Sequence, residues 1–290
     1  MEKYSVALII VTFNRLKTLK RNLEFVRRQK RLPEYVVIVE NGSTDGTLEF
    51  LESQSELDFL PIGENIGWSG GLDAGMTFAK QKWNPDFFWL MDDDSFPNAD
   101  VLSTLISKLS VQNEPGIMGL IGCNFKYGMP YVPEPAPNVR EVDFVLVDNA
   151  LISKEVVEKI GNLDPGYFIM AEDYEYCKRA KKYGFKVWLW RDGNELVERL
   201  HLGSQLSSRS IIWRGYYHSR NHLLILRDYP SLKDSLGYIH RHGKFILHAV
   251  LFGKNKWEVV KFRFMGIWDG LRGIKGKRVD PLTLKRIPLK

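Results

Sequence analysis

The sequence predicts an α/β fold with a mostly parallel central β-sheet flanked by helices, followed by a basic, helical C-terminal extension. Short apolar segments typical of buried strands alternate with amphipathic segments typical of helices, which favours parallel strands joined by crossover helices. At 290 residues and 44% hydrophobic, the chain can form one large domain or a domain with an appendage. We expect strands at 4–12, 35–39, 87–91, 142–147 and 186–190, and helices at 16–29, 44–53, 70–82 and 153–160.

The first half of the chain contains the clearest elements. Residues 4–12 are dominated by aliphatic side chains, and the helix that follows places leucine and valine at helical spacing. The second strand is β-branched and lies between Pro33 and the turn Asn41-Gly42. Ser43 or Thr44 can cap the short helix that begins there. Another helix leads into the apolar strand 87–91.

The second half begins with a helix near Asn98 and continues with a segment, 128–138, that holds four prolines and is expected as an extended loop. Strand, helix and strand then follow, and the pattern past Arg209 becomes helical and basic. We therefore expect two regions, an α/β domain at 1–208 and a basic helical region at 209–290.

Charge is divided unevenly between these regions. Residues 201–290 contain 18 Lys and Arg against 5 Asp and Glu, whereas residues 1–200 contain 23 against 30. Two cysteines, Cys123 and Cys177, do not make a disulfide framework and fit a reducing compartment. We find neither a signal peptide pattern nor an apolar run long enough to span a bilayer, so a cytoplasmic protein is expected.

Three consecutive carboxylates, Asp92, Asp93 and Asp94, stand where the strand 87–91 ends. Adjacent carboxylates repel one another and need a cation or several donors to remain ionised together. Ligands of open α/β sheets bind outside the carboxyl ends of the strands. Asp92 and Asp94 can therefore offer hard oxygen ligands to Mn²⁺ or Mg²⁺ while a substrate diphosphate completes the coordination shell.

Four motifs in order point to a known family. No Gly-x-Gly-x-x-Gly follows the first strand and no Gly-x-x-x-x-Gly-Lys-Ser/Thr loop occurs, which disfavours dinucleotide and P-loop enzymes. The chain instead has Val-Thr-Phe-Asn at 11–14, Val-Glu-Asn-Gly-Ser-Thr-Asp-Gly-Thr at 39–47, Asn-Ile-Gly-Trp-Ser-Gly-Gly at 65–71 and the aspartate triplet. Over about residues 4–230 it resembles the family 2 glycosyltransferases, which have the GT-A fold.

The resemblance implies a nucleotide-sugar site. It puts Thr12 and Asn14 beside the nucleotide and Glu40 at the place of a carboxylate, usually Asp, that accepts the N3–H of uracil or thymine. It puts Asp92 and Asp94 on the metal and Asp93 toward the ribose or the donor sugar. The remaining residues expected along the donor are Asn41, Asn65, Gly67 and Gly71, and the 1–208 region becomes the expected catalytic domain.

A second block, residues 161–179, resembles the family segment that contains the catalytic base. Asp173 matches the base and Glu172 the neighbour that orients it or an acceptor hydroxyl. His201 matches a third metal ligand, which suits Mn²⁺ better than Mg²⁺. Tyr-Tyr-His-Ser-Arg-Asn at 216–221 resembles a segment of galactofuranosyl- and rhamnosyl-transferases. Its Arg220 is expected either to bind diphosphate or acceptor or to join the C-terminal helices to the core, and Trp68 can stack on a sugar.

The segment 241–278 interleaves Lys and Arg with aromatic and aliphatic residues. This pattern favours an interfacial helix on an anionic membrane, on the inner face of the cell membrane, and would suit a polyprenyl-linked acceptor. A self-association face that forms a homo-oligomer is the alternative. Nucleic acid is not expected as a partner, because no nucleic-acid-binding module is recognisable.

Together these features predict an inverting, metal-dependent glycosyltransferase. It would move a sugar from a UDP- or dTDP-sugar, with UDP-galactofuranose and dTDP-rhamnose favoured, to a saccharide or lipid-linked acceptor in cell-surface polysaccharide synthesis. Two alternatives remain open. One is a sugar nucleotidyltransferase, although the Gly-rich loop expected after its first strand is missing. The other is a catalytically silent subunit that only binds the nucleotide sugar.

Overall fold

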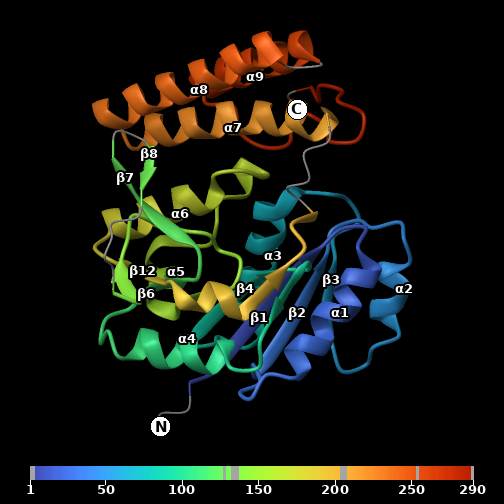
Figure 1. Cartoon of the computed structure of the whole chain (residues 1–290). Helices are drawn as coiled ribbons and strands as arrows, with labels where there is room; N and C mark the ends of the chain where they lie inside the picture. The colour runs from blue at the N-terminus through green and yellow to red at the C-terminus, as the bar shows by residue number, and fades with distance from the viewer. Residues whose placement is uncertain (1–3, 127–128, 132–136, 203–207, 253–254, 289–290) are drawn as a thin grey trace.

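The computed structural model describes residues 4–126, 129–131, 137–202, 208–252 and 255–288, and it has a central eight-stranded sheet (Figure 1). The strand order is β3-β2-β1-β4-β11-β6-β12-β9, in which the four strands from β3 to β4 are parallel and β11 and β9 are antiparallel to their neighbours. The sheet consists of β1 (Val6–Thr12), β2 (Tyr35–Glu40), β3 (Asp58–Pro61), β4 (Phe87–Asp92), β6 (Gly116–Gly119), β9 (Val139–Glu141), β11 (Ala150–Ser153) and β12 (Lys186–Trp190).

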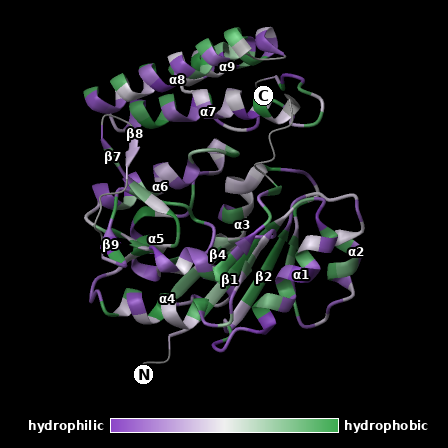
Figure 2. Ribbon diagram, viewed as in Figure 1, coloured by the Kyte–Doolittle hydropathy of each residue, from purple (hydrophilic) through white to green (hydrophobic). Residues whose placement is uncertain are grey.

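Helices cover both faces of this sheet. One face packs against α1 (Leu16–Arg27), α2 (Thr47–Glu52) and α4 (Val101–Ser110), and the other against α3 (Gly67–Lys82), α5 (Lys154–Ile160) and α6 (Glu172–Lys182). The side chains of β1 alternate between the two cores, Val6, Leu8 and Ile10 on one side and Ala7 and Ile9 on the other. A strand buried on both faces reads as a continuous apolar run, which explains why the sequence identified it. Figure 2 shows the hydrophobic residues gathered on these central strands.

Short strands at the edges were not predicted. A two-stranded sheet joins β5 (Ser95–Pro97) to β13 (Val197–Arg199), which follows the 3₁₀ turn η2 (Asp192–Leu196), and a three-stranded sheet contains β7 (Gly122–Lys126), β8 (Met129–Tyr131) and β10 (Phe144–Val145). Of the strand predicted at 142–147, only β10 forms, and it pairs with β7 outside the central sheet. The chain leaves the central sheet there because Asp143 bonds the backbone N–H of Phe125 and its own N–H bonds Asn124. Within the segment 128–138, which was predicted as an extended loop, residues 129–131 form the strand β8. Residues 128 and 132–136 lie outside the described residues.

Three helices, α7 (Ser208–Asp228), α8 (Leu232–Phe252) and α9 (Lys256–Leu271), form a separate layer above the rest of the chain (Figure 1). Tyr216 of α7 donates to the buried Asp269 of α9 at 2.6 Å, which fixes these two helices together. None of the described helices combines the length and hydropathy needed to cross a bilayer. Helix α7 begins at Ser208, and the division into domains at 1–208 and 209–290 stays a prediction.

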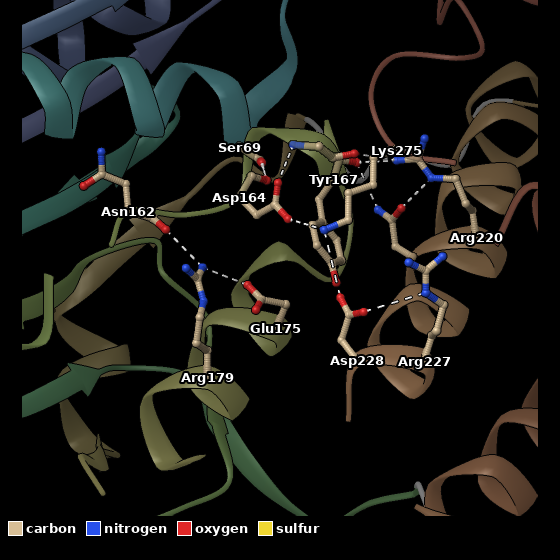
Figure 3. Close-up of polar contacts among 12 residues, drawn as sticks. Ser69, Asn162, Asp164, Tyr167, Glu175, Arg179, Arg220, Arg227, Asp228 and Lys275 are labelled. Atoms are coloured by element: carbon tan, nitrogen blue, oxygen red, sulfur yellow. Dashed lines mark hydrogen bonds and ion pairs between the residues drawn. The ribbon is translucent and has the colours of Figure 1, made fainter. Parts of the chain in front are cut away.

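Arg220 attaches this layer to the 3₁₀ turn η1 (Pro165–Tyr167) and to the C-terminal segment (Figure 3). Its side chain is fully buried and donates to the carbonyl oxygens of Tyr167 at 2.9 Å, of Gly166 at 3.2 Å and of Gly276. The sequence left two roles open for Arg220. These contacts are the ones expected of a residue that joins the C-terminal helices to the core.

We expect Arg220→Met to lower the free energy of unfolding by roughly 3 kcal/mol, because three buried carbonyl groups lose a charged donor. Denaturant titration would measure the change. Arg227→Gln is the matched control on the same helix, since its half-exposed guanidinium contacts only Asp228, at 3.9 Å, among the ion pairs of the described chain. Equal stability of the two variants would contradict the attachment role.

Candidate active site

A cavity of about 720 Å³ lies between the carboxyl ends of β1 and β4, the first turns of α3 and α6, and helices α7 and α8. Most of the residues predicted from the sequence line it: Thr12, Asn41, Asn65, Gly67, Trp68, Asp92, Asp93, Asp94, Glu172, Asp173 and His201. Asn14, Glu40, Gly71 and Arg220 are not among the lining residues. The structure therefore brings the aspartate triplet and the predicted base together in one cavity.

Asp92 is the last residue of β4, and its position is fixed through its backbone. Its N–H donates to Asp148 at 3.0 Å, and Asp148 in turn accepts from Ser95 at 2.8 Å and from the Arg199 guanidinium at 2.6 Å. Within the described residues no donor reaches the Asp92 carboxylate itself. Burial, followed by repulsion from Asp148, Asp94 and Asp93, raises the pKa of Asp92 well above its ordinary value. An added cation would relieve this repulsion.

Asp93 points toward the end of β1. Its carboxylate accepts from the Thr12 hydroxyl at 2.8 Å and from Arg15 at 2.6 Å, and the residue is 2% exposed. Burial raises its pKa to about 6, an effect that Arg15 opposes. The predicted contact with the ribose or donor sugar stays a prediction, and in this structure Thr12 and Arg15 occupy both oxygens.

Asp94 holds the segment that contains His201. The Asp94 carbonyl accepts from the N–H of Leu200 at 3.1 Å, and its carboxylate accepts from that of Leu202 at 2.7 Å. His201 lies between these two bonds with a positive φ of 51°. No three His, Cys, Asp or Glu residues form a metal-ligand group within the described part of the chain, so Asp92, Asp94 and His201 as ligands stay a prediction.

Glu172 and Asp173 begin α6 after a strained turn. Phe168, Met170 and Ala171 all have positive φ, which non-glycine residues adopt only when neighbours hold them. The Asn221 side chain supplies this restraint, because its amide donates to the carbonyl oxygens of Tyr167, Ile169 and Met170. Helix α7 therefore fixes the loop that delivers both carboxylates to the cavity.

Both carboxyl groups resist ionisation. Burial raises the pKa of Glu172 and of Asp173, and for Glu172 the neighbouring Asp173 raises it further while Arg214 opposes the shift. The Oε2 atom of Glu172 is buried and bonds no partner among the described residues. A pair of carboxyls with pKa values near neutrality can exchange a proton with a substrate at physiological pH.

The residues expected along the nucleotide hold two loops together. Asn41 donates to the Gly67 carbonyl at 3.2 Å, and Asn65 accepts the Gly67 N–H at 2.9 Å. A side chain at Gly67 would meet the carbonyl oxygen of Phe168 at 2.2 Å, and one at Gly71 would meet Val11 at 2.6 Å. Glycine is thus required at both positions for close packing.

Glu40 and Asn14 lie beside the cavity and shape the loop 41–47. Glu40 is 1% exposed and accepts the N–H of Ser43, while Asn14 accepts that of Thr44 at 2.7 Å. The base contact predicted for Glu40 stays a prediction.

Several lining residues were not predicted, namely Arg15, Asp148, Arg199, Arg214, His218, His222 and Arg241. Asp148 could have been found, because it follows a strand segment as the aspartate triplet does. The others depend on tertiary contacts that no local pattern indicates.

Comparison with known proteins identifies the family of this chain. The family model described as "Glycosyl transferase family 2" matches residues 7–161, more than half of the chain. The dTDP-rhamnosyl transferase RfbF of Shigella flexneri is 25% identical over 299 residues, which cover 92% of this chain and 96% of the relative. The galactofuranosyltransferase GlfT1 of Mycolicibacterium smegmatis is 34% identical over 104 residues, covering 35% of this chain and 34% of the relative.

Solved structures share the fold at low sequence identity. The mannosyltransferase PcManGT from Pyrobaculum calidifontis, in complex with GDP-Man and Mn²⁺, is 14% identical, has a TM-score of 0.55, and the alignment covers 93% of this chain and 88% of that one. S. aureus TarS in complex with UDP-GlcNAc is 15% identical with a TM-score of 0.53, covering 93% and 92%. The predicted GT-A fold is confirmed, and with the family model spanning the strands that carry the aspartate triplet, the chain belongs to glycosyl transferase family 2 and is a glycosyltransferase.

Proposed function

We propose that this glycosyltransferase is inverting and metal-dependent, and that it transfers a sugar from a UDP- or dTDP-sugar to a saccharide or lipid-linked acceptor in cell-surface polysaccharide synthesis. The observation that carries the proposal is that two groups of buried carboxylates, at the end of β4 and at the start of α6, line one cavity. A metal-dependent displacement with inversion uses two such groups, one to hold the cation at the leaving diphosphate and one to take the proton of the attacking hydroxyl.

Asp173 is the base in this scheme. Its carboxylate takes the proton from the acceptor hydroxyl as that oxygen attacks C1 of the donor sugar, and the C1–O bond to the nucleoside diphosphate breaks on the opposite face. One bond forms as the other breaks, so the product has inverted configuration and no covalent enzyme intermediate is required. Glu172, buried beside Asp173, orients the base or the hydroxyl.

The residues at the end of β4 fit a divalent cation. Asp92 offers a carboxylate that no described donor reaches, Asp94 lies two residues away, and His201 follows the strand paired with β5. These three would hold Mn²⁺ or Mg²⁺, which when bound supplies positive charge for the leaving diphosphate. Arg15, 3.5 Å from Asp94, adds a fixed positive charge at the same place.

The donor is inferred from the relatives. RfbF, which aligns over nearly the whole chain, is by its name a dTDP-rhamnosyl transferase, and GlfT1 is a galactofuranosyltransferase. We therefore favour dTDP-rhamnose and UDP-galactofuranose, and the carboxylate of Glu40 suits either base because it can only accept a hydrogen bond. The structural neighbours bind GDP-Man or UDP-GlcNAc, so the fold alone does not select the base.

Nucleotides should identify the donor class directly. We expect UDP or dTDP to raise the melting temperature of the full chain only when Mn²⁺ is present, because a ligand that binds the native state stabilises it by mass action. A thermal-shift panel with UDP, dTDP, GDP and CDP, with and without Mn²⁺, would measure this. Stabilisation by GDP or CDP alone would overturn the assignment of Glu40.

Asp173→Asn should abolish turnover while nucleotide binding is retained, since the amide cannot accept the proton. Burial raises the pKa of Asp173 to about 7, and the base must be ionised to act, so the wild-type kcat/KM should rise with pH through about 7. Steady-state rates at several pH values would show this limb. Near wild-type activity of the variant would refute the base assignment, and turnover by the wild type distinguishes the enzyme from a silent binding subunit.

We also propose that α8 and α9 dock on an anionic membrane. Each has an exposed apolar stripe at helical spacing, with side chains 40–79% exposed: Leu232, Leu236, Ile239, Leu247, Val250 and Leu251 on α8, and Trp257, Phe264, Trp268 and Leu271 on α9. The exposed charges described on 232–272 are Lys233, Lys244, Lys256, Lys261 and Arg272 against Glu258 alone. Apolar side chains among basic ones suit an interface with anionic lipid.

Replacing Ile239, Trp257 and Trp268 by serine together should abolish binding to vesicles that contain anionic lipid, because apolar area buried at the interface is lost. Vesicle sedimentation would measure binding. The control variant combines Leu32→Ser and Val111→Ser, at side chains that are 54% and 71% exposed outside α8 and α9. It should bind vesicles as the wild type does. If the triple variant binds vesicles as wild type does and only its oligomeric state changes, the stripes form a contact between copies.

A further inference from the structure

One wall of the cavity is basic. Arg214, His218 and His222 stand at four-residue intervals on α7, so they lie on one face of that helix, and Arg241 of α8 joins them in the cavity wall. The carboxylates of β4 and α6 make up other parts of the lining. The cavity is therefore acidic where it meets the sheet and basic where α7 and α8 cover it.

This basic wall extends away from the predicted base. The charges near Arg214 include Glu172 and Asp92, which oppose the lowering of its pKa by burial. Burial also lowers the pKa of Arg241, and the nearby groups that oppose this change are Tyr174, Asp234 and Tyr238. None of these three belongs to the carboxylates at the end of β4 or at the start of α6. Asp234 also accepts from Lys178 at 2.8 Å. Arg214 thus lies at the reacting end of the wall and Arg241 at its far end.

The wall has donors that the described parts of the chain do not satisfy. Arg214 donates to the thioether sulfur of Met170 at 3.5 Å, which is a weak acceptor, and its Nε is unbonded. His218 Nδ1 is also buried and bonds no partner among the described residues. Buried polar groups in native proteins nearly always have a partner. The surplus of donors indicates that an acceptor-rich ligand binds here.

The positive charge of the wall comes from its arginines. Burial, with the nearby charges of Arg263 and Arg241, lowers the pKa of His218 to about 3, so the imidazole is neutral and contributes one N–H donor. Guanidinium groups bind pairs of phosphate oxygens in a planar arrangement. Two arginines separated by two neutral imidazoles match an extended anion that carries several oxygens.

We propose that Arg214, His218, His222 and Arg241 form a subsite for a phosphate or diphosphate group of the acceptor. This inference rests on the proposed function, because the acceptor hydroxyl must lie at Asp173 and the rest of the acceptor then extends along the wall. Aromatic side chains of Phe125, Phe144 and Tyr174 line the cavity and can contact a sugar or an apolar chain.

The test is equilibrium binding of farnesyl diphosphate and of inorganic pyrophosphate to the full chain by calorimetry, with saturating dTDP or UDP and Mn²⁺ present so that the donor site is filled. We expect farnesyl diphosphate to bind and farnesol not to bind. Arg241→Gln should weaken binding about tenfold, since one charge-assisted contact is lost. Arg28→Gln, which changes an exposed arginine directly after α1 and outside the cavity, should leave affinity unchanged.

The two probes distinguish the sources of the anion. Equal affinity for pyrophosphate indicates that the phosphates alone are recognised, and tighter binding of farnesyl diphosphate indicates a lipid-linked acceptor. The proposed subsite is overturned if neither probe binds. It is also overturned if Arg214→Gln and Arg241→Gln both bind the probes with wild-type affinity and have unchanged melting curves. A separate titration of UDP or dTDP in the presence of Mn²⁺ reports donor binding, so a failure of the donor proposal appears there, while the diphosphate probes judge the subsite.

Discussion

Repulsion among buried carboxylates at the end of β4 is the constraint around which the site is organised. Asp92, Asp93, Asp94 and Asp148 lie together at the edge of the sheet, where burial strengthens their mutual repulsion. The protein offsets part of it with Arg15, which contacts Asp93 and Asp94, and with Arg199 on Asp148. The balance is incomplete at Asp92, which faces the cavity. The charge that remains is the chemical reason to expect a cation there.

The parts of the fold that the sequence predicted are those with local signals. Strands buried on both faces give continuous apolar runs, and β1, β2 and β4 were identified for that reason. Strands such as β3, β5 and β13 have three or four residues and depend on their partners, so no pattern indicated them. The strand expected at 142–147 is reduced to β10 and joins β7 because Asp143 bonds that neighbouring strand, which is a tertiary interaction.

The residues of the candidate site also divide into those that a local sequence pattern indicates and those that depend on tertiary packing. Motifs that sit at strand ends, such as the aspartate triplet and Asn41, were found from the sequence and line the cavity. Residues that reach the cavity from another element were missed, because their place depends on how α7 and α8 pack over the sheet. Arg214 and His218 are examples, since helical spacing alone does not indicate which face of α7 meets the cavity.

The neighbouring residues Arg220 and Asn221 both join α7 to the rest of the chain through bonds to backbone carbonyls. Arg220 bonds the carbonyls of Gly166 and Gly276, and Asn221 bonds those of the strained turn before α6. The layer that covers the cavity and the turn that presents Asp173 are therefore parts of one mechanical unit. Recombination between relatives would have to exchange the segment 166–171 along with the C-terminal helices. Exchange of the helices alone would leave the turn before α6 without the Asn221 bonds that hold its positive-φ residues.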